Sequence, residues 1–433
     1  MSELRVSEME PGREEVLAGE LRRTTSTVDA ELLERARQII EEVRARGDEA
    51  LVELAYRYDR VQLTPSELTS YREEMRDAAE GVDSELLRSL RTLSGRVARL
   101  ERMRLRRLRF SVRYPEGTVI RSEVRPLDSV GCYAPGGRAV YLSTIVMMGV
   151  PASVAGVRRK VLATPPQPDE RRRREVLAAA HVAGFDTVLW SGGAQAVAAL
   201  AYGTRSVERV RKVIGPGNRY VVAAKLLLQS EVSIDFAAGP TELVVLFDSN
   251  SDLNSVALDL LAQAEHSPDT LVLAITTDRS AADELIERLR ELTRELPEDS
   301  AVRVSLERTG PVLISQSWRS AMKFVNALSP EHLSIASNGL RALVKDLVNA
   351  GVVTMGRGMV SVVVDYFAGA SHVLPTGGWA ASKCTLSVLD FVRTVNVVTG
   401  NANVVRRASR EVGVLALAEG LKFHSAAMSS GNR

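Results

Sequence analysis

The sequence predicts an α/β fold in which two units each hold a parallel β-sheet. From about Val119 onward, short runs rich in β-branched residues alternate with helix-length, alanine-rich segments. Strands that alternate with helices are typical of βαβ units, whose strands lie parallel. The alternation occurs in two successive series, and 433 residues are enough for more than one hydrophobic core. We therefore expect two α/β units rather than one domain.

A helical region precedes the first series. Asp29 is suited to cap a helix whose apolar residues share one face, and Gly47 is suited to end that helix. Asp48 can cap the next helix. The expected apolar stripe comprises Leu32, Leu33, Ala36, Ile39, Ile40 and Val43.

Each series supplies strands and helices in alternation, which fits a parallel sheet. The expected strands lie within residues 160–166, 187–193 and 211–217, and then within 242–248, 271–278, 311–316, 332–337 and 351–356. The expected helices lie within residues 173–184, 194–203, 257–266 and 281–296. The last fifty or so residues return to a mixed helical pattern and end in an amphipathic stretch at residues 410–424.

Composition and charge exclude several classes of protein. The formal net charge is only +2, so the basic runs at 104–109 and 171–174 do not make nucleic acid an expected partner. The two cysteines lie far apart, which argues against a disulfide framework or a thiolate zinc site. No apolar run approaches the roughly 18 residues that span a bilayer, and the N-terminus lacks the apolar core of a signal peptide. A cytoplasmic protein without a membrane partner is expected.

Four of the five histidines occur in short polar motifs. His266, His332, His372 and His424 each lie near a Glu, Gln or Asp, which is the assortment that a metal site with a nearby acid/base pair requires. His181, in an alanine-rich helix, is expected to be a packing residue. This distribution points to an enzyme.

Two of these motifs are candidates for metal binding. Gln263 and His266 lie three residues apart near a helix end, so they share one face, although capping of that helix end competes with metal binding. Asp365 and His372 are expected to follow a strand and to lie at its carboxyl end, where α/β proteins place ligands. An Asx turn with a loop histidine explains this second pair equally well.

Glu331 and His332 are adjacent and precede an expected strand. In a loop they can approach one reacting centre from two directions, the imidazole accepting a hydroxyl proton and the carboxylate activating water. Taken alone, such a pair is a weak indication of catalysis. Glu419 and His424 lie near the C-terminus, where a solvated histidine without a special role is the simpler interpretation.

Glycine-rich segments at 131–141 and 214–225 each follow a β-rich run and lead into a helix-compatible one. Backbone amides at such turns can bind a phosphate. Neither segment matches GxGxxG and no Walker lysine is present, so ordinary turn formation is an equally good explanation.

The order and spacing of eight motifs closely resemble those of the histidinol dehydrogenase family, over nearly the whole chain. These motifs are VGCYAPGG, SGGAQAVAALAYGT, VIGPGNRYV, AGPTE, QAEHSPD, PEHL, DYFAGASHVLPTGG and AEGLKFH. The resemblance implies a zinc-dependent, four-electron oxidation of L-histidinol to L-histidine through L-histidinal, with two NAD. This reaction completes histidine biosynthesis.

The resemblance also implies roles for individual residues. One zinc ion per subunit would be held by Gln263, His266, Asp365 and His424. His332 would remove the hydroxyl proton, and Glu331 would activate water in the second half of the reaction. The family's NAD contacts match Tyr133, Gln195 and Asn218. Its substrate contacts match Thr241, Gln263, His266, His332, Asp365, Glu419 and His424, with His372 close by.

At the level of fold, the resemblance implies two Rossmann-like α/β domains with parallel sheets, a helical N-terminal region and a small C-terminal helical segment. An N-terminal extension would occupy residues 1–29. One domain, with the metal and catalytic residues, would comprise 30–132 and 241–380, and the NAD-binding domain would comprise 133–240. Residues 381–433 would cross to the partner in an intertwined homodimer.

In that homodimer, Glu419 and His424 would complete the active site of the partner subunit. The resemblance makes Cys132 a structural residue rather than a thiol that traps the aldehyde, because the water-activating Glu331 makes a thiol unnecessary. The chain departs from the family at three places. Thr241 stands where relatives usually have Ser, and residues 141–152 and 383–387 differ from the usual sequence.

Two alternatives remain. A relative on the same scaffold would oxidise another primary alcohol, such as a sulfonated diol, to its acid, but Glu419 and His424 match histidinol rather than the redox step. A metal-dependent or regulatory protein without catalysis would have no need of Glu331 and His332.

Overall fold

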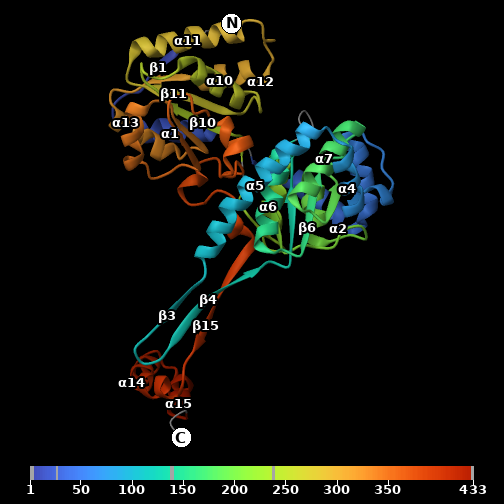
Figure 1. The fold of residues 1–433 in the computed structure, drawn as a ribbon, viewed down its shortest axis with the longest axis vertical. Coiled ribbons are helices and arrows are strands. Elements are labelled where there is room, and N and C mark those ends of the chain that lie inside the picture. Colours follow the sequence, from blue (N-terminus) through green and yellow to red (C-terminus); the bar gives the residue numbers. More distant parts are fainter. Residues whose placement is uncertain (1–3, 26–27, 137–140, 237–238, 431–433) are drawn as a thin grey trace.

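The computed structural model describes residues 4–25, 28–136, 141–236 and 239–430. Two α/β units lie side by side, and an extended arm projects away from them to the C-terminal end of the chain (Figure 1). Each unit holds one six-stranded sheet, here called sheet A and sheet B. The expected α/β class with two sheets is therefore confirmed.

Sheet A has the order β1-β12-β11-β10-β13-β14, and every strand pair in it is parallel. Its strands are β1 (Val6–Glu8), β10 (Glu242–Leu246), β11 (Leu271–Thr276), β12 (Val312–Ile314), β13 (His332–Ile335) and β14 (Val352–Met355). One face is covered by α10 (Leu253–Ala264), α11 (Arg279–Thr293) and α12 (Ala301–Thr309), and the other by α1 (Glu14–Thr25) and α13 (Trp318–Leu328). Both faces are buried, which explains why these strands are almost continuously apolar.

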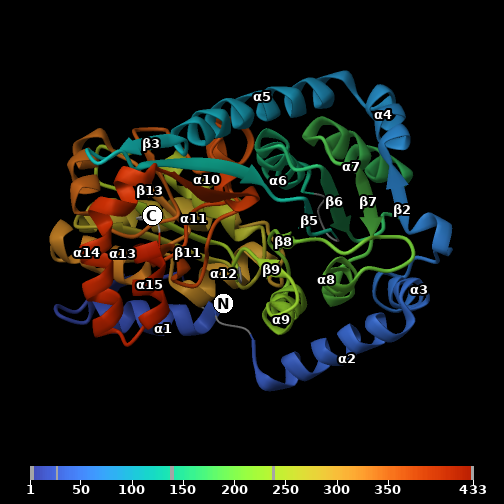
Figure 2. The ribbon, with the colours of Figure 1, turned by 90° about the horizontal axis from the view of Figure 1, so that it is seen from below.

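Sheet B has the order β2-β7-β6-β5-β8-β9 and is parallel except for the edge strand β2. Its strands are β2 (Thr69–Tyr71), β5 (Ser129–Tyr133), β6 (Arg159–Thr164), β7 (Thr187–Trp190), β8 (Lys212–Ile214) and β9 (Ser233–Ile234). One helical layer holds α4 (Arg72–Gly81), α5 (Ser84–Arg107), α6 (Leu142–Ala155) and α7 (Glu170–Ala183). The opposite layer holds α2 (Ala30–Arg46), α3 (Asp48–Leu54), α8 (Gly193–Tyr202) and α9 (Arg219–Leu228), as the view from below shows (Figure 2).

The arm is a three-stranded antiparallel sheet that carries two helices at its tip (Figure 1). Its strands are β3 (Phe110–Arg113), β4 (Val119–Pro126) and β15 (Val392–Thr399), and the tip helices are α14 (Ala402–Ala418) and α15 (Lys422–Ser430). The mixed helical pattern expected for the last fifty residues is confirmed for the tip. The strand β15, which pairs with β4 over eight positions, was missed.

The expected division of the chain differs from the contacts at its N-terminal half. The extension expected at residues 1–29 is not separate in its described part, because β1 pairs with β12 and α1 packs against α13 in the unit of sheet A. Residues 30–132 do not belong with 241–380, because α2 packs on α8 and α9, and α5 packs on α6, in the unit of sheet B. Apolar helix faces show that a segment packs against something, but they do not show against which sheet.

Most local predictions are confirmed. The Asp29 side chain accepts a hydrogen bond from the Leu32 amide at 2.8 Å, and Gly47 ends α2 with a φ of 57°. Asp48 does not cap α3, because Gly47 occupies that position and the Asp48 carboxylate binds Ser206 instead. No helix in the described part of the chain is long and apolar enough to cross a membrane.

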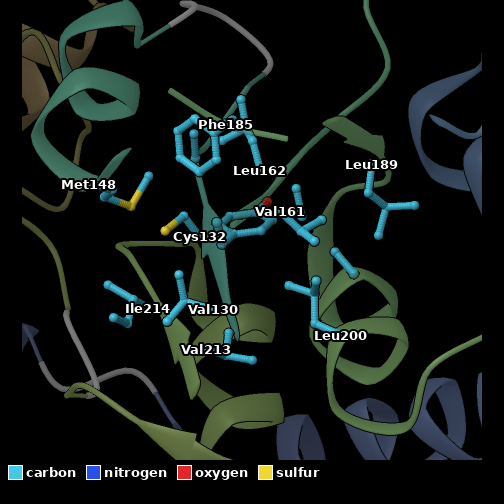
Figure 3. Close-up of a cluster of buried hydrophobic side chains, with 14 of the residues drawn as sticks. Val130, Cys132, Met148, Val161, Leu162, Phe185, Leu189, Leu200, Val213 and Ile214 are labelled. Atoms are coloured by element: carbon cyan, nitrogen blue, oxygen red, sulfur yellow. The ribbon is translucent and has the colours of Figure 1, made fainter. Parts of the chain in front are cut away.

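The core of the sheet B unit surrounds β5. Val130 and Cys132 point from β5 into a cluster with Met148, Leu162 and Ile214 (Figure 3). Burial raises the pKa of the Cys132 thiol well above its ordinary value, so a thiolate nucleophile is disfavoured. This agrees with the structural role expected for Cys132.

Candidate functional site between the two units

A cavity of about 720 Å³ lies between the two units. Sheet A contributes the N-terminal ends of β10 and β13, whereas sheet B contributes the loops that follow β5 and β8. The residues that line it include Pro135, Tyr141, Thr144, Pro216, Gly217, Asn218, Arg219, Thr241, Gln263, His266, Glu331, His332, Asp365 and His372. Parts of the expected motifs at 131–141 and 238–242 lie outside the described residues, namely 137–140 and residue 238.

One expectation about this cavity is wrong. Asp365 does not follow a strand, because residues 362–368 are helical and Asp365 lies in the π-helical turn η4 (Val364–Ala368). The run of valines suggested a strand, but Asp259 accepts hydrogen bonds from the Ser361 amide and so stabilises the start of a helical turn. The site therefore does not lie at the carboxyl end of a sheet A strand.

Glu331 and His332 are both buried, and the structure places their side chains next to each other. His332 Nδ1 lies 3.7 Å from Glu331 Oε2, and His332 Nε2 lies 3.9 Å from Asp365 Oδ1. Neither ring nitrogen has a hydrogen-bond partner within the described residues. Burial opposes the charged form of His332, but the facing carboxylates outweigh this and raise its pKa. The His332 ring thus faces the carboxylates of Glu331 and Asp365, and both of its nitrogens can bind a ligand.

The Glu331 carboxylate is held by two donors from the start of β10. Its Oε2 accepts from the Thr241 hydroxyl at 2.5 Å and from the Glu242 amide at 2.9 Å. Glu242 returns this contact, since its Oε2 accepts from the Glu331 amide at 3.2 Å while Oε1 accepts from the Gly377 amide. Desolvation raises the pKa of Glu242 to about 8. The two glutamates therefore fix the adjacent strand ends to each other.

Gln263, His266 and Asp365 line the same cavity. Gln263 is buried, and its Oε1 has no hydrogen-bond partner in the described residues. His266 Nδ1 lies 3.2 Å from the carbonyl oxygens of Ala262 and Gln263, so Nδ1 carries the proton and Nε2 keeps its lone pair. An amide oxygen, an imidazole nitrogen and a carboxylate are thus available at one place.

Glu419 and His424 are not near this cavity in their own chain. Both are exposed in α14–α15 at the tip of the arm, and neither lines the cavity (Figure 1). Among the described residues, no cluster of three or more His, Cys, Asp or Glu side chains is placed to hold a metal ion. This follows because one expected ligand is a glutamine and another lies at the tip.

His372 bridges the two units. Its Nδ1 lies 3.1 Å from the Asp365 carbonyl oxygen, and its Nε2 lies 2.9 Å from the Thr144 hydroxyl on α6. Burial lowers the pKa of His372, which matches a neutral ring that donates through one nitrogen and accepts through the other. Both nitrogens are occupied, so this histidine positions Asp365 rather than offering a free ligand. Tyr141 stacks on His266 across the same gap, with ring centroids 6.3 Å apart.

Of the three residues matched to NAD contacts, Tyr133 is the last residue of β5, whereas Gln195 follows β7 and Asn218 follows β8; only Asn218 lines the cavity. Its side chain caps α9 by accepting from the Tyr220 and Val221 amides. Tyr133 and Gln195 are buried, and the Tyr133 hydroxyl accepts from the Gly193 amide at 3.1 Å. Desolvation raises the pKa of Tyr133 to about 12.

Sequence reasoning missed several residues that shape this site. Glu242, Thr144, Asp259 and Ser361 make the contacts that hold the candidate residues in place. Asp259 and Gln263 lie four residues apart on one helix, which was the available signal, because an aspartate on the buried face of a helix requires a partner. Nothing in the sequence identified Ser361 as that partner.

Comparisons with known proteins agree on one family. The histidinol dehydrogenase family model matches residues 21–430. The chain is 40% identical over 412 residues to histidinol dehydrogenase of Thermus thermophilus, covering 95% of this chain and 97% of the relative. It is 38% identical over 391 residues to that of Oceanobacillus iheyensis, covering 90% and 91%. The crystal structure of histidinol dehydrogenase from Elizabethkingia anophelis has a TM-score of 0.91 at 27% identity, covering 99% and 98%. The chain belongs to the histidinol dehydrogenase family and is an oxidoreductase.

Proposed function

We propose that this enzyme oxidises L-histidinol to L-histidine through L-histidinal, using two NAD. The observation that carries the proposal is the buried pair of Glu331 and His332 in a cavity between the two units. His332 holds two unpartnered ring nitrogens and Glu331 is oriented by two donors, which suits a proton acceptor beside a carboxylate that activates water. The proposal includes a cytoplasmic location, which the two unpaired cysteines support.

The residues present fit a zinc ion. Gln263 Oε1 is a buried acceptor without a partner among the described residues, His266 presents Nε2 to the cavity, and Asp365 supplies a carboxylate. In the proposal these three residues hold the ion together with His424 of a second subunit. When bound, the zinc would orient the substrate so that its reacting carbon faces His332.

In the first oxidation, His332 accepts the proton of the substrate hydroxyl as hydride leaves the adjacent carbon for NAD. Glu331 and Asp365, both within 4 Å of the ring, stabilise the imidazolium that forms. In the second oxidation, Glu331 removes a proton from water that adds to the aldehyde carbon, and the hydrate loses a second hydride. Water supplies the additional oxygen of the carboxylate product, and two NAD are reduced.

The loops after β5 and β8 support the placement of NAD on the sheet B side. Asn218, with Pro216 and Gly217, lines the cavity opposite His332. Tyr133 and Gln195 are buried, and the Tyr133 hydroxyl accepts from the Gly193 amide at the start of α8. We assign Tyr133, Gln195 and Asn218 to cofactor binding. We assign substrate binding to Thr241, Glu419 and His424, together with His332 and the other zinc ligands.

The arm supports a homodimer in which Glu419 and His424 act in the partner's site. Apolar side chains are exposed at its tip, among them Val414, Leu415 and Phe423, whose exposed fractions are 64%, 64% and 90%. A monomer has no use for such a surface, whereas a second subunit would cover it. In the described part of the chain neither Glu419 nor His424 lines the cavity of its own subunit, which is consistent with a ligand from a second subunit.

The dimer can be tested by complementation. Subunits with His424→Ala and subunits with His332→Ala should each form inactive homodimers. In a heterodimer, one of the two sites combines His332 of the His424→Ala subunit with His424 of the His332→Ala subunit, so that site is intact. Random assortment should therefore restore about a quarter of the wild-type rate if His424 acts across the dimer. No restoration, with heterodimers demonstrated, would show that His424 acts within its own subunit or not at all.

The reaction is tested by measuring the ratio of NADH to histidine formed by the purified, zinc-loaded protein with L-histidinol. Two NADH per histidine, with rates that fall sharply in Glu331→Gln and His332→Ala, would support the assignment. His181→Ala is the control, because His181 is exposed on α7, contrary to the packing role expected for it, and does not line the cavity. No turnover of histidinol would direct attention to another primary alcohol, such as a sulfonated diol, with Thr241 as the first residue to examine.

A further inference from the structure

A chain of buried hydrogen bonds runs from α10 to the turn that carries Asp365. Gln263 Nε2 donates to Ser361 Oγ at 3.2 Å, and Ser361 Oγ donates to Asp259 Oδ1 at 2.7 Å. The Ser361 amide also donates to the Asp259 carboxylate at 2.9 and 3.0 Å. Asp259, Gln263 and Ser361 are each at most 3% exposed. Asp259 does not line the cavity between the units, so its carboxylate does not contact a ligand there.

The direction of these bonds determines how the Gln263 amide is turned. An ionised carboxylate only accepts hydrogen bonds, so the Ser361 hydroxyl donates its hydrogen bond to Asp259. Ser361 Oγ then has only lone pairs left for Gln263, and it accepts from the NH₂ group but not from the carbonyl oxygen. The amide is consequently held with Oε1 on the other side, where it is buried and has no partner in the described part of the chain.

Asp259 also fixes the second segment that reaches the cavity. By accepting from the Ser361 amide it acts as an N-terminal cap for residues 362–368, and this helical turn places Asp365. One carboxylate thus connects Gln263, through a serine hydroxyl, and Asp365, through a backbone turn. The two side chains come from segments about a hundred residues apart.

We propose that Asp259 and Ser361 are positioning residues that set the zinc affinity of this enzyme by orienting Gln263 Oε1 and the turn of Asp365 toward one ion. The inference rests on the zinc site proposed above. It assigns a function to two residues that touch neither the substrate nor the cofactor. Partners of this kind, which orient metal ligands, typically contribute 10- to 100-fold to metal affinity.

The first test compares Ser361→Ala with Ser337→Ala in the full-length protein. Ser337 is a matched control, because it is equally buried and its hydroxyl donates to Asp248 at 3.0 Å, yet it follows the far end of β13 and does not line the cavity. The zinc dissociation constant is measured by competition with a chromophoric chelator. We expect roughly 10- to 100-fold weaker binding for Ser361→Ala and an unchanged constant for Ser337→Ala.

A double-mutant cycle separates amide orientation from general packing. A glutamate at position 263 offers an oxygen whichever way the carboxyl group is turned, so it has no need of Ser361. We therefore expect Ser361→Ala to weaken zinc binding in the wild-type background but not in Gln263→Glu. An equal loss in both backgrounds would mean that Ser361 acts through packing, and it would overturn the inference.

A second pair of variants with side chains of equal shape keeps the test valid if the alanine variant misfolds. Ser361→Thr and Ser361→Val have side chains of similar volume and differ mainly in the hydroxyl group. Tighter zinc binding by the threonine variant supports the proposal, whereas equal binding contradicts it. If wild-type protein binds no stoichiometric zinc, the proposed metal site itself fails. Tight zinc binding by both wild type and Ser361→Ala overturns only the inference about Asp259 and Ser361.

Discussion

The two walls of the cavity use their polar groups in opposite ways. The acidic wall consists of Gln263, Glu331, His332 and Asp365. Within the described residues, its Gln263 Oε1 and both His332 ring nitrogens have no hydrogen-bond partner. On the glycine-rich wall, described here by residues 133–135 and 214–219, no side-chain atom is both buried and unpartnered. Its polar side chain Asn218 is engaged in capping α9. The acidic wall therefore offers unpartnered side-chain atoms to a ligand, whereas the glycine-rich wall offers mainly backbone groups.

The largest expected effect comes from removing the proton acceptor on the acidic wall. His332→Asn keeps a polar side chain in the same pocket but cannot accept a proton near neutral pH. We expect kcat for histidinol oxidation to fall about 10²- to 10⁴-fold, the usual contribution of a general base. Stopped-flow NADH formation measures this, with His181→Ala as the control. A decrease below tenfold would mean that the acidic wall does not carry the proton transfer.

The next effect concerns the pH dependence of stability. The pKa of Glu242 is raised to about 8, so the folded state holds this proton more tightly than the unfolded chain. Its contribution to the free energy of unfolding is complete below the unfolded pKa near 4.5 and is lost as the pH rises through about 8.

We therefore expect wild type to lose stability between pH 5 and 8 relative to Glu242→Gln, by about 1.4 kcal/mol per unit of pKa shift at most. Urea unfolding at several pH values gives both slopes. Parallel slopes for the two proteins would show that Glu242 does not titrate in this range.

A smaller effect is expected on the glycine-rich wall. Asn218→Ala removes the side chain that accepts from the Tyr220 and Val221 amides at the start of α9. The loss of such a cap costs about 1 kcal/mol of stability, and we expect KM for NAD to rise more than kcat falls. Asn218→Asp restores an N-cap and serves as the comparison. A decrease in kcat alone would place Asn218 among groups that act on the reacting atoms.

The smallest effect tests the departure from the usual family sequence. Thr241→Ser keeps the hydroxyl that donates to Glu331, so we expect rates within about threefold of wild type, equivalent to less than 1 kcal/mol. Thr241→Val keeps the shape but removes this donor, and it should slow aldehyde oxidation more than alcohol oxidation. Supplying L-histidinal directly separates the two steps. Equal slowing of both steps would mean that Thr241 does not act through Glu331.

Features that depend on local sequence pattern could be predicted, whereas features that depend on contacts between distant residues could not. The strands of sheet A, such as β11, are continuous apolar runs because helices cover both faces, and that pattern is visible in the sequence. The valines before Asp365 show the same pattern, but they form a helical turn because Asp259 binds its start. A contact between residues a hundred positions apart overrides the local preference.

Within the site, residue types marked Gln263, His266, Glu331, His332 and Asp365 as candidates, the family resemblance gave them roles, and the structure brings all five to one cavity. Their supporting contacts could not be foreseen, since Thr144 and Ser361 are ordinary hydroxyl residues until the fold places them. The sequence also did not show against which sheet α2 packs. Its apolar stripe is clear, but the stripe does not identify sheet B.

The pairing of β1 with β12 has a consequence for the order of events during synthesis. Val6 leaves the ribosome some 300 positions before its partner Val312. At translation rates of about 5 to 20 residues per second, β1 waits roughly 15 to 60 s for a neighbour. Sheet B is complete at Ile234, so it can close first and tether the waiting N-terminal segment until sheet A is assembled around β10.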